Sequence, residues 1–325
     1  MACGEGYPGL PPVRAAHKAM DTEFVVSICV GGEDERPFAE SAAAAVFERI
    51  DALERLLTRF EDTSDVAVVR SLAPGQVAPV ARETMDLLVL SAKVCAATRG
   101  AFDPTVGPVM DRLRAPRAAD SAPRAEWGRI DAKSCADALA RGGMRRLVLD
   151  VENSLVSVAP DALGRATPLE LDFGGVGKGY ALDVCAELLA SEPFSMKRFL
   201  LDAGTSTVLA CGGRWRIGVG GAFKERTRLP VSVELSSGAL SGSGFEIQGH
   251  HVVDVRRGGA ARRWAAAWAR AESAAVADAL STAALALSAA ELKAAAAELS
   301  ASVLVARDQP RVLDRVRDPL AWFGA

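Results

Sequence analysis

The chain alternates between short apolar runs and longer segments in which apolar residues recur every three or four positions. The run over 22–30, TEFVVSICV, is rich in β-branched and aromatic residues and predicts a strand. The segment 37–60 has helical spacing instead and predicts a helix with one apolar face. That face is formed by Ile50, Leu53, Leu56 and Leu57. A second helix is predicted over 81–100, where Gly100 suits the left-handed conformation that ends many helices.

The rest of the chain predicts more strands and two further helices. A glycine-rich stretch joins a strand to a helix at roughly 179–191, and a long helix is predicted over 271–298. Short apolar runs predict strands within 145–150, 154–160, 197–204, 214–220, 230–235, 250–255 and 300–306, the last being the final strand. This order lacks a regular strand–helix–strand rhythm. It predicts a mixed α/β (α+β) fold, built as one compact domain that can divide into two lobes.

Composition argues against nucleic acid as a partner and indicates the redox state of the cysteines. The 325 residues carry a formal net charge of −3, which leaves no basic footprint for nucleic acid as a partner. None of the six cysteines forms a Cys-x-x-Cys pair, so we expect free thiols in a reducing compartment.

The N-terminal residues and an Ala-rich segment near the C-terminus indicate the cellular compartment of the protein. Residues 1–19 are rich in Pro and Gly and predict a flexible N-terminal segment, which leaves 20–325 as the domain. Those first residues contain no apolar stretch typical of a signal peptide, and charges interrupt the Ala-rich segment 265–299. We therefore expect a cytoplasmic protein without a membrane span.

The stretch LDFGGVGKGYALD, residues 171–183, is the strongest single candidate for ligand binding. It lacks the spacing of both the Walker A loop and the Rossmann fingerprint. Its glycines nevertheless let the backbone approach a ligand, amide groups at the start of a helix attract anions, and Lys178 adds a positive charge. A tight turn with a solvated lysine is an equally good interpretation of these residues alone.

Three other motifs carry candidate chemistry. The rigid loop AFDPTVGP, residues 101–108, is either a structural turn or a ligand-binding loop. Asp278 and Thr282 are four residues apart on a predicted helix, so they share a face and can form part of a Mg²⁺ shell; two ordinary helix residues are the simpler interpretation. His250 and His251 are adjacent in a predicted strand, so only one of them can face a site as a general base.

In this order the motifs resemble those of the FAD:protein FMN transferases, also known as the thiamine-biosynthesis lipoprotein family. The similar blocks are AMDTEFVVSICV, LLTRFEDTSDVAVV, AFDPTVGPVM, LDFGGVGKGYALD, SG…HHVVD and VADALSTAALAL. They run from Met20 to Thr282 and so cover nearly the whole chain.

The resemblance implies a substrate and a reaction. It implies that FAD is cleaved between its two phosphates with Mg²⁺, that FMN passes to a Ser or Thr of an acceptor flavoprotein through a phosphoester bond, and that AMP leaves. By position, the residues implied to hold FAD or line its flavin and adenine sites are Met20, Phe60, Ala101, Phe102, Asp103, Asp172 and Lys178. The implied Mg²⁺ ligands are the carbonyl of Gly175 with Asp278 and Thr282, and His251 stands at the position of the base.

The chain departs from the family pattern in three places. It has GTST at 204–207 instead of the family's Gly-Gly-Asp/Asn, it has VRRG at 255–258 without the usual proline and threonine, and it has Asp21 instead of glycine. Two alternatives therefore stay open. One is hydrolysis of FAD to FMN and AMP, and the other is a degenerate member that binds FAD without catalysis.

Overall fold

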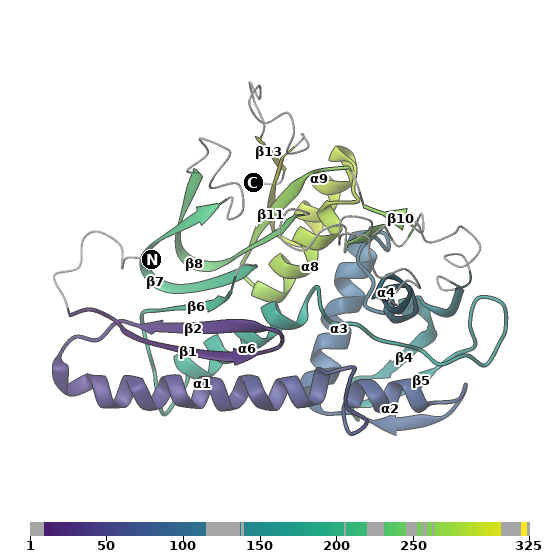
Figure 1. The fold of residues 1–325 in the computed structure, drawn as a ribbon, viewed down its shortest axis with the longest axis horizontal. Helices are drawn as coiled ribbons and strands as arrows, with labels where there is room; N and C mark the ends of the chain where they lie inside the picture. Colours follow the sequence, from purple (N-terminus) through teal and green to yellow (C-terminus); the bar gives the residue numbers. More distant parts are fainter. Residues whose placement is uncertain are drawn as a thin grey trace, which may run out of the picture.

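The fold is described from a computed structural model. It describes residues 10–114, 137, 140–204, 206–219, 231–244, 252–254, 256, 259–261, 263–306 and 320–323. A large antiparallel sheet with helices on one face occupies most of the molecule, and a small three-stranded sheet lies beside it (Figure 1). The predicted mixed α/β fold with a single compact body is confirmed.

The large sheet has eight strands in the order β1-β2-β6-β7-β8-β11-β12-β13, and every neighbouring pair is antiparallel. Their bounds are β1 Val13–Ala19, β2 Thr22–Ile28, β6 Phe199–Ala203, β7 Thr207–Val219, β8 Val231–Gly244, β11 Ala266–Ala271, β12 Ser302–Ala306 and β13 Leu320–Phe323. A two-residue turn joins β1 to β2, and both of its residues, Met20 and Asp21, have positive φ. Such a turn matches the twist of the strands it connects.

Three predictions about this sheet are corrected. Residues 13–19 of the predicted flexible segment form β1, because they pair with the whole length of β2; residues 1–9 lie outside the described part. The run over 300–306 is not the final strand, since β13 pairs with it on the sheet edge. The residues directly before the glycine-rich stretch, where a strand was expected, are described by the structure and form a loop rather than a strand.

The predicted long helix over 271–298 is wrong as well. Residue 271 ends strand β11, and two helices follow, α8 (Ala274–Ala284) and α9 (Ala289–Glu298). Ser288 starts α9 with a capping box, in which its hydroxyl accepts from the Glu291 amide and the Glu291 side chain accepts from the Ser288 amide. The S-x-x-E signature of this cap is visible in the sequence.

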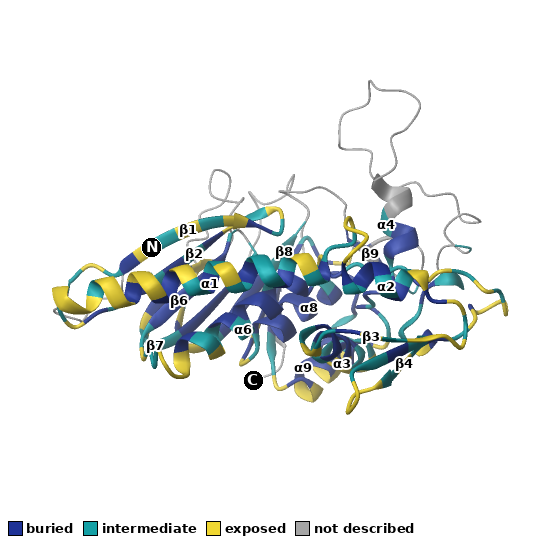
Figure 2. Ribbon diagram, turned by 90° about the horizontal axis from the view of Figure 1, so that it is seen from below, coloured by how far each residue is buried: buried dark blue, intermediate teal, exposed yellow. Residues whose placement is uncertain are grey.

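Helices cover one face of the large sheet. They are α1 (Arg36–Leu57), α6 (Gly177–Ala190) and α8, and they pack against β1, β6 and β8 respectively (Figures 1 and 2). The buried stripe of α1 has the predicted helical spacing; it consists of Ala39, Ala42, Ala43, Val46, Ile50, Leu53 and Leu57, while Leu56 is only half-buried. Burying each large aliphatic side chain stabilises the fold by about 1.5–3 kcal/mol.

The opposite face of the sheet has its own, smaller apolar cluster. Leu200, Val208, Leu235 and Leu240 belong to it. Strand β6 lies between the two cores, and all five of its residues are buried. The sheet therefore holds strand residues in two separate environments, and strand register decides which side chain meets which core.

The small lobe consists of the three-stranded sheet β3-β5-β4 and the helices near it (Figure 1). Its elements are β3 Val77–Pro79, β4 Leu147–Asp150, β5 Leu155–Val158, α2 Asp65–Ser71, α3 Arg82–Ala97, α4 Gly107–Arg114 and the short helix η3 Met144–Arg146. The remaining elements are η1 Glu33–Glu35, β9 Val253–Asp254 and β10 Gly259–Ala260. The C-terminal end of α1 leads into this lobe, so one helix spans both parts of the molecule.

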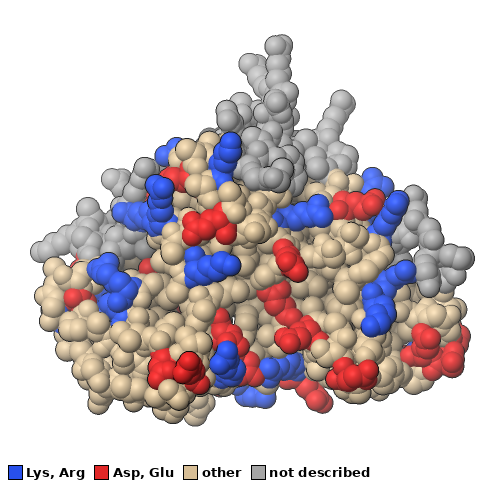
Figure 3. Space-filling view, turned by 180° about the vertical axis from the view of Figure 1, so that it is seen from behind, with Lys and Arg blue, Asp and Glu red and all other residues tan. Residues whose placement is uncertain are grey.

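The surface, the thiols and the helices each add one observation. On the face shown in Figure 3, Lys and Arg side chains lie among Asp and Glu side chains. The described cysteines, Cys29, Cys95, Cys185 and Cys211, are free thiols, as predicted. Within the described residues, no helix combines the length and the apolar character that crossing a membrane requires.

Candidate functional site

The glycine-rich stretch forms a loop that leads into α6 two residues earlier than predicted, at Gly177. Gly179 lies where α6 approaches the start of α8, and a Cβ there would collide with the carbonyl oxygen of Ala274. The Gly179 amide donates to Oδ2 of Asp278 at 3.1 Å. Glycine at this position thus allows two helices to touch and brings the loop to the carboxylate on α8.

The three predicted metal ligands come together at this contact. Asp278 is 3 % exposed, and Thr282 follows one turn later, with Oγ1 donating to the Asp278 carbonyl at 3.2 Å. A Cβ on Gly175 would lie 3.4 Å from Thr282 Oγ1, so the loop backbone is in contact with this helix face. The hydroxyl does bond its own helix, as the simpler interpretation held, and it also lies 3.3 Å from Ser243 Oγ.

The donor set fits a small divalent cation. Oδ2 of Asp278 accepts from the Gly179 amide and Oδ1 accepts from Ser241 Oγ, both neutral donors. Among the described residues, no cationic side chain pairs with this carboxylate. A buried carboxylate without a cation is costly. One carboxylate, one hydroxyl and one carbonyl suit Mg²⁺, which keeps few protein ligands and several waters.

Asp172 connects the glycine loop to two other segments. Its Oδ1 accepts from the Gly174 amide at 2.9 Å, and its own amide donates to the Pro104 carbonyl at 2.7 Å. Its Oδ2 accepts from Arg59 Nη1 at 3.0 Å. Asp172 therefore fixes the glycine loop against the 101–108 loop through its amide and against the end of α1 through its carboxylate.

Arg59 also lies at the candidate site, although it is not among the residues predicted from the sequence. Its side chain is 14 % exposed, and a second carboxylate, Glu170, lies 3.8 Å from Nη2. Its position inside LLTRFEDTSDVAVV, next to Phe60, was the available signal. Only the tertiary structure brings it to Asp172, which is 113 positions away.

Lys178 also lies at the loop. Its Nζ donates to the Gly174 carbonyl at 3.0 Å, so the side chain folds back over the turn that precedes it. This ammonium group and the Arg59 guanidinium both reach residues 172–174. Because Arg59 is paired with Asp172 and Glu170, Lys178 is the positive charge that the loop offers to an anion.

The residues predicted to line the flavin and adenine sites fall into different environments. Ala101 and Phe102 are buried, and the Phe102 ring edge lies 3.7 Å from the place of a Cβ on Gly175. Phe60 is 81 % exposed, with the Arg59 guanidinium 5.9 Å from its ring centroid. Met20 sits in the β1–β2 turn, where its amide donates to the Glu54 carboxylate of α1 at 2.7 Å.

Asp103 holds its own loop in place. Oδ1 accepts from the amide and the hydroxyl of Thr105, at 2.8 and 2.6 Å, and Oδ2 accepts from the Met144 amide at 3.2 Å. The Gly143 amide donates to Thr105 Oγ1 as well. Oδ1 thus holds the 101–108 loop in its own turn and Oδ2 docks it onto η3, a role that the sequence did not indicate.

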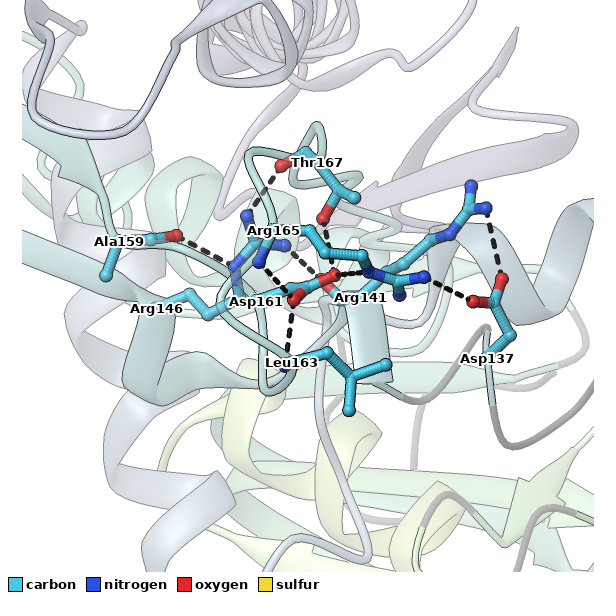
Figure 4. Close-up of polar contacts among 8 residues, drawn as sticks. All are labelled: Asp137, Arg141, Arg146, Ala159, Asp161, Leu163, Arg165 and Thr167. Atoms are coloured by element: carbon cyan, nitrogen blue, oxygen red, sulfur yellow. Dashed lines mark hydrogen bonds and ion pairs between the residues drawn. The ribbon is translucent and has the colours of Figure 1, made fainter.

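Arg146, the last residue of η3, belongs to a network of charged side chains (Figure 4). Arg146 is almost fully buried and donates to the carbonyls of Arg141, Ala159 and Thr167. Asp161 accepts from two backbone amides and from Arg165, and these hydrogen bonds lower its pKa although burial alone would raise it. Arg146 and Asp161 are held by these hydrogen bonds, which indicates structural support rather than a second site, although Arg165 Nη2 and Arg141 Nε are buried without a hydrogen-bond partner among the described residues.

The predicted base lies outside the described residues, as does His250. Nearby, Asp254 is buried and Arg256 donates to Glu291 at 2.7 Å and to the Ala286 carbonyl at 3.1 Å. Hydrogen bonds from Ser288 and from Arg256 lower the pKa of Glu291 to about 2. Arg256 belongs to residues 255–258, where the chain departs from the family pattern, and it links this segment to Glu291 of α9.

Comparison with known proteins gives consistent results. The model of the ApbE family matches residues 20–305. Among curated proteins, the FAD:protein FMN transferase of Klebsiella pneumoniae (strain 342) is 28 % identical over 262 residues, which is 74 % of this chain and 68 % of that protein. The FAD:protein FMN transferase of Escherichia coli (strain K12) is 26 % identical over 259 residues, with the same coverage.

Solved structures share the fold. The ApbE protein of Thermotoga maritima superposes with a TM-score of 0.74 at 23 % identity, covering 94 % of this chain and all of that one. The flavinyl transferase ApbE of Pseudomonas stutzeri, in its apo form, gives 0.73 at 22 % identity, covering 96 % and 95 %.

Proposed function

Because the chain belongs to the ApbE family, we propose that it is a Mg²⁺-dependent transferase that moves FMN from FAD to a Ser or Thr of an acceptor flavoprotein. One observation carries the proposal. The glycine loop, with Lys178 beside it, meets Asp278 and Thr282 at the contact of α6 with α8. An anion site and a cation site thus adjoin, which is what a metal-assisted reaction at a pyrophosphate requires.

The loop is proposed to bind the pyrophosphate of FAD. Lys178 supplies positive charge beside Gly174, and the glycines allow close approach of the backbone. Asp172 keeps the loop in one conformation through its bonds to Gly174 and Arg59. Holding the phosphates in a fixed geometry is the main contribution a protein makes to phosphoryl transfer.

Mg²⁺ would be held by the Gly175 carbonyl, Asp278 and Thr282. When bound there, it supplies positive charge to the phosphate oxygens. The oxygen of the acceptor hydroxyl forms a bond to the FMN phosphorus as the bond to the AMP phosphate breaks, and AMP leaves. His251 is the proposed base for the hydroxyl proton, on the strength of the family resemblance.

Mass spectrometry of a candidate acceptor flavoprotein tests the function. The protein is incubated with the acceptor, FAD and Mg²⁺, and the expected products are an FMN adduct on one Ser or Thr and an equal amount of AMP. Omitting Mg²⁺, or changing the modified hydroxyl residue to Ala, should remove the adduct. AMP with free FMN and no adduct would establish a hydrolase instead. FAD binding without any AMP would establish a binding protein.

A further inference from the structure

A chain of buried hydroxyl groups leads from the large sheet to the carboxylate of Asp278. Thr207 Oγ1 lies 2.9 Å from Ser241 Oγ, and Ser241 Oγ donates to Asp278 Oδ1 at 3.3 Å. Thr207 and Ser241 are 1 % and 0 % exposed, so solvent does not compete for these bonds. A third hydroxyl, Ser281 on α8, lies 3.3 Å from Ser241 Oγ.

The chain has a defined direction. An ionised carboxylate only accepts hydrogen bonds, and a serine hydroxyl carries a single proton. Ser241 gives that proton to Asp278, so Thr207 must be the donor in its pair with Ser241. Each donor polarises the next, which strengthens the final bond to the carboxylate.

Strand register brings the two hydroxyls to this place. Thr207 on β7 and Ser241 on β8 are direct partners in the sheet and point toward α8. The next pair, Val208 and Leu240, points to the opposite face and packs in the smaller apolar cluster. A slip of one residue would exchange the two pairs and put aliphatic side chains against Asp278.

The surroundings of Asp278 explain why such a chain would matter. Helix α8 is rich in alanine, and Ala274, Ala275, Ala277 and Ala279 are all fully buried. These small side chains let α8 lie close to α6 and to the sheet, but they offer little bulk to hold a neighbouring carboxylate in one rotamer. Hydrogen bonds must fix it instead, and the Gly179 amide reaches only Oδ2.

We propose that Thr207 and Ser241 are positioning residues, which orient the Asp278 carboxylate for the divalent cation. The inference rests on the proposed Mg²⁺ site. It also accounts for one departure from the family pattern, because Thr207 is the last residue of the GTST segment. This segment supplies a polar contact to the metal carboxylate through Ser241.

Mn²⁺ binding to the full chain in the presence of FAD tests the inference, with free Mn²⁺ measured by electron paramagnetic resonance. Ser241→Ala should raise the Kd for Mn²⁺ roughly 10-fold, the lower end of what loss of a ligand's supporting hydrogen bond usually costs. Thr207→Val should raise it less, about 3-fold, because the Ser241 donor remains. Thr207→Ser keeps the hydroxyl and should restore the wild-type Kd.

The matched control is Thr84→Val. Thr84 is a buried threonine on α3 that donates to the Asp65 carboxylate at 2.6 Å, in the small lobe. It should lower stability without changing the Kd for Mn²⁺. An equal shift in this control, or no rescue by Thr207→Ser, would show that the effect is general destabilisation and would overturn the inference.

Asp278→Ala separates this inference from the proposed function. If Asp278→Ala abolishes Mn²⁺ binding while Ser241→Ala and Thr207→Val bind like the wild type, the positioning role is wrong and the metal site stands. If Asp278→Ala binds Mn²⁺ like the wild type, the metal site itself is wrong. The positioning role then fails with it.

Discussion

At the scale of single residues, two buried carboxylates differ in their hydrogen bonding: Asp278 on helix α8 and Asp202 on strand β6. Each oxygen of Asp278 has a donor. Asp202 on β6 is 9 % exposed, and its Oδ1 has no hydrogen-bond partner in the described part of the chain. Burial raises the pKa of Asp202 to about 6, although the charge of Arg14 acts against the shift. Asp202 therefore costs stability when it is ionised.

The effect of Asp202→Asn on stability should depend on pH. The pKa rises on folding, so the folded state is penalised progressively as pH increases through about 6. Asp202→Asn should raise the free energy of unfolding by about 2 kcal/mol at pH 8 and by much less at pH 4. Urea unfolding at both pH values measures this. Glu187→Gln, on the exposed face of α6, is the control and should change little at either pH. Equal effects of Asp202→Asn at pH 4 and pH 8 would refute the ionisation argument.

The two adjacent histidines also belong to the residue scale. If His251 takes the proton of the acceptor hydroxyl, His251→Ala should lower the transfer rate by roughly 10²–10⁴-fold and leave the Kd for FAD nearly unchanged. The rate should also lose its decline at acid pH, since an imidazole base works only when neutral. His250→Ala is the internal control. Damage from His250→Ala instead would mean that the other ring faces the site, and no effect from either would direct attention to Asp254.

At the scale of elements, a residue of one helix caps another. Asp183 on α6 accepts from the amides of Ala274 and Ala275 and from the Ser273 hydroxyl, at 2.6, 3.0 and 2.6 Å. These are the first residues of α8, so the cap fixes the helix that carries Asp278 to the helix that carries Lys178. A carboxylate at a helix N-terminus is also favoured by the helix dipole.

Asp183→Ala should therefore affect both stability and metal dependence. Loss of three hydrogen bonds to a mostly buried carboxylate should lower the free energy of unfolding by about 2–3 kcal/mol, and the Mg²⁺ concentration for half-maximal rate should rise. Ser288→Ala removes the cap of α9, which carries no predicted site residue. It should cost about 1 kcal/mol and leave the Mg²⁺ dependence unchanged. Equal Mg²⁺ dependence in both variants would show that the α6–α8 cap has no part in the site.

At the scale of the whole molecule, the candidate site joins segments that are far apart in the chain. Arg59 follows α1, Phe102 belongs to a loop of the small lobe, Gly175 precedes α6, and Thr282 lies on α8. A ligand held by all four links the small lobe to the large sheet. Binding should therefore stabilise the molecule as a unit.

Thermal unfolding tests this linkage. FAD with Mg²⁺ at about 100 times the Kd should raise the free energy of unfolding of the wild type by about 2.7 kcal/mol. In Asp278→Ala, FAD should still stabilise the protein, but addition of Mg²⁺ should bring no further increase. A variant that gains as much from Mg²⁺ as the wild type would place the cation elsewhere.

The sequence by itself determined the local features. Helical spacing on α1 and the dense apolar run of β2 depend on neighbouring residues, and both elements were predicted close to their observed bounds. Spacing singled out Asp278 and Thr282 as a pair on one helix face, and the family resemblance added Gly175. They are brought together because α6 and α8 meet at Gly179. Features that depend on residues close together in the chain can therefore be predicted from the sequence.

Only the tertiary structure decided which distant groups meet. The pairing of Arg59 with Asp172, and of Thr207 with Ser241, depends on loop docking and strand register, which no local pattern specifies. The same is true of Asp103, whose Oδ2 accepts from an amide 41 positions away. Such contacts form because an unpaired buried polar group is costly, so most of them have a partner, and the packing of the whole molecule decides which one.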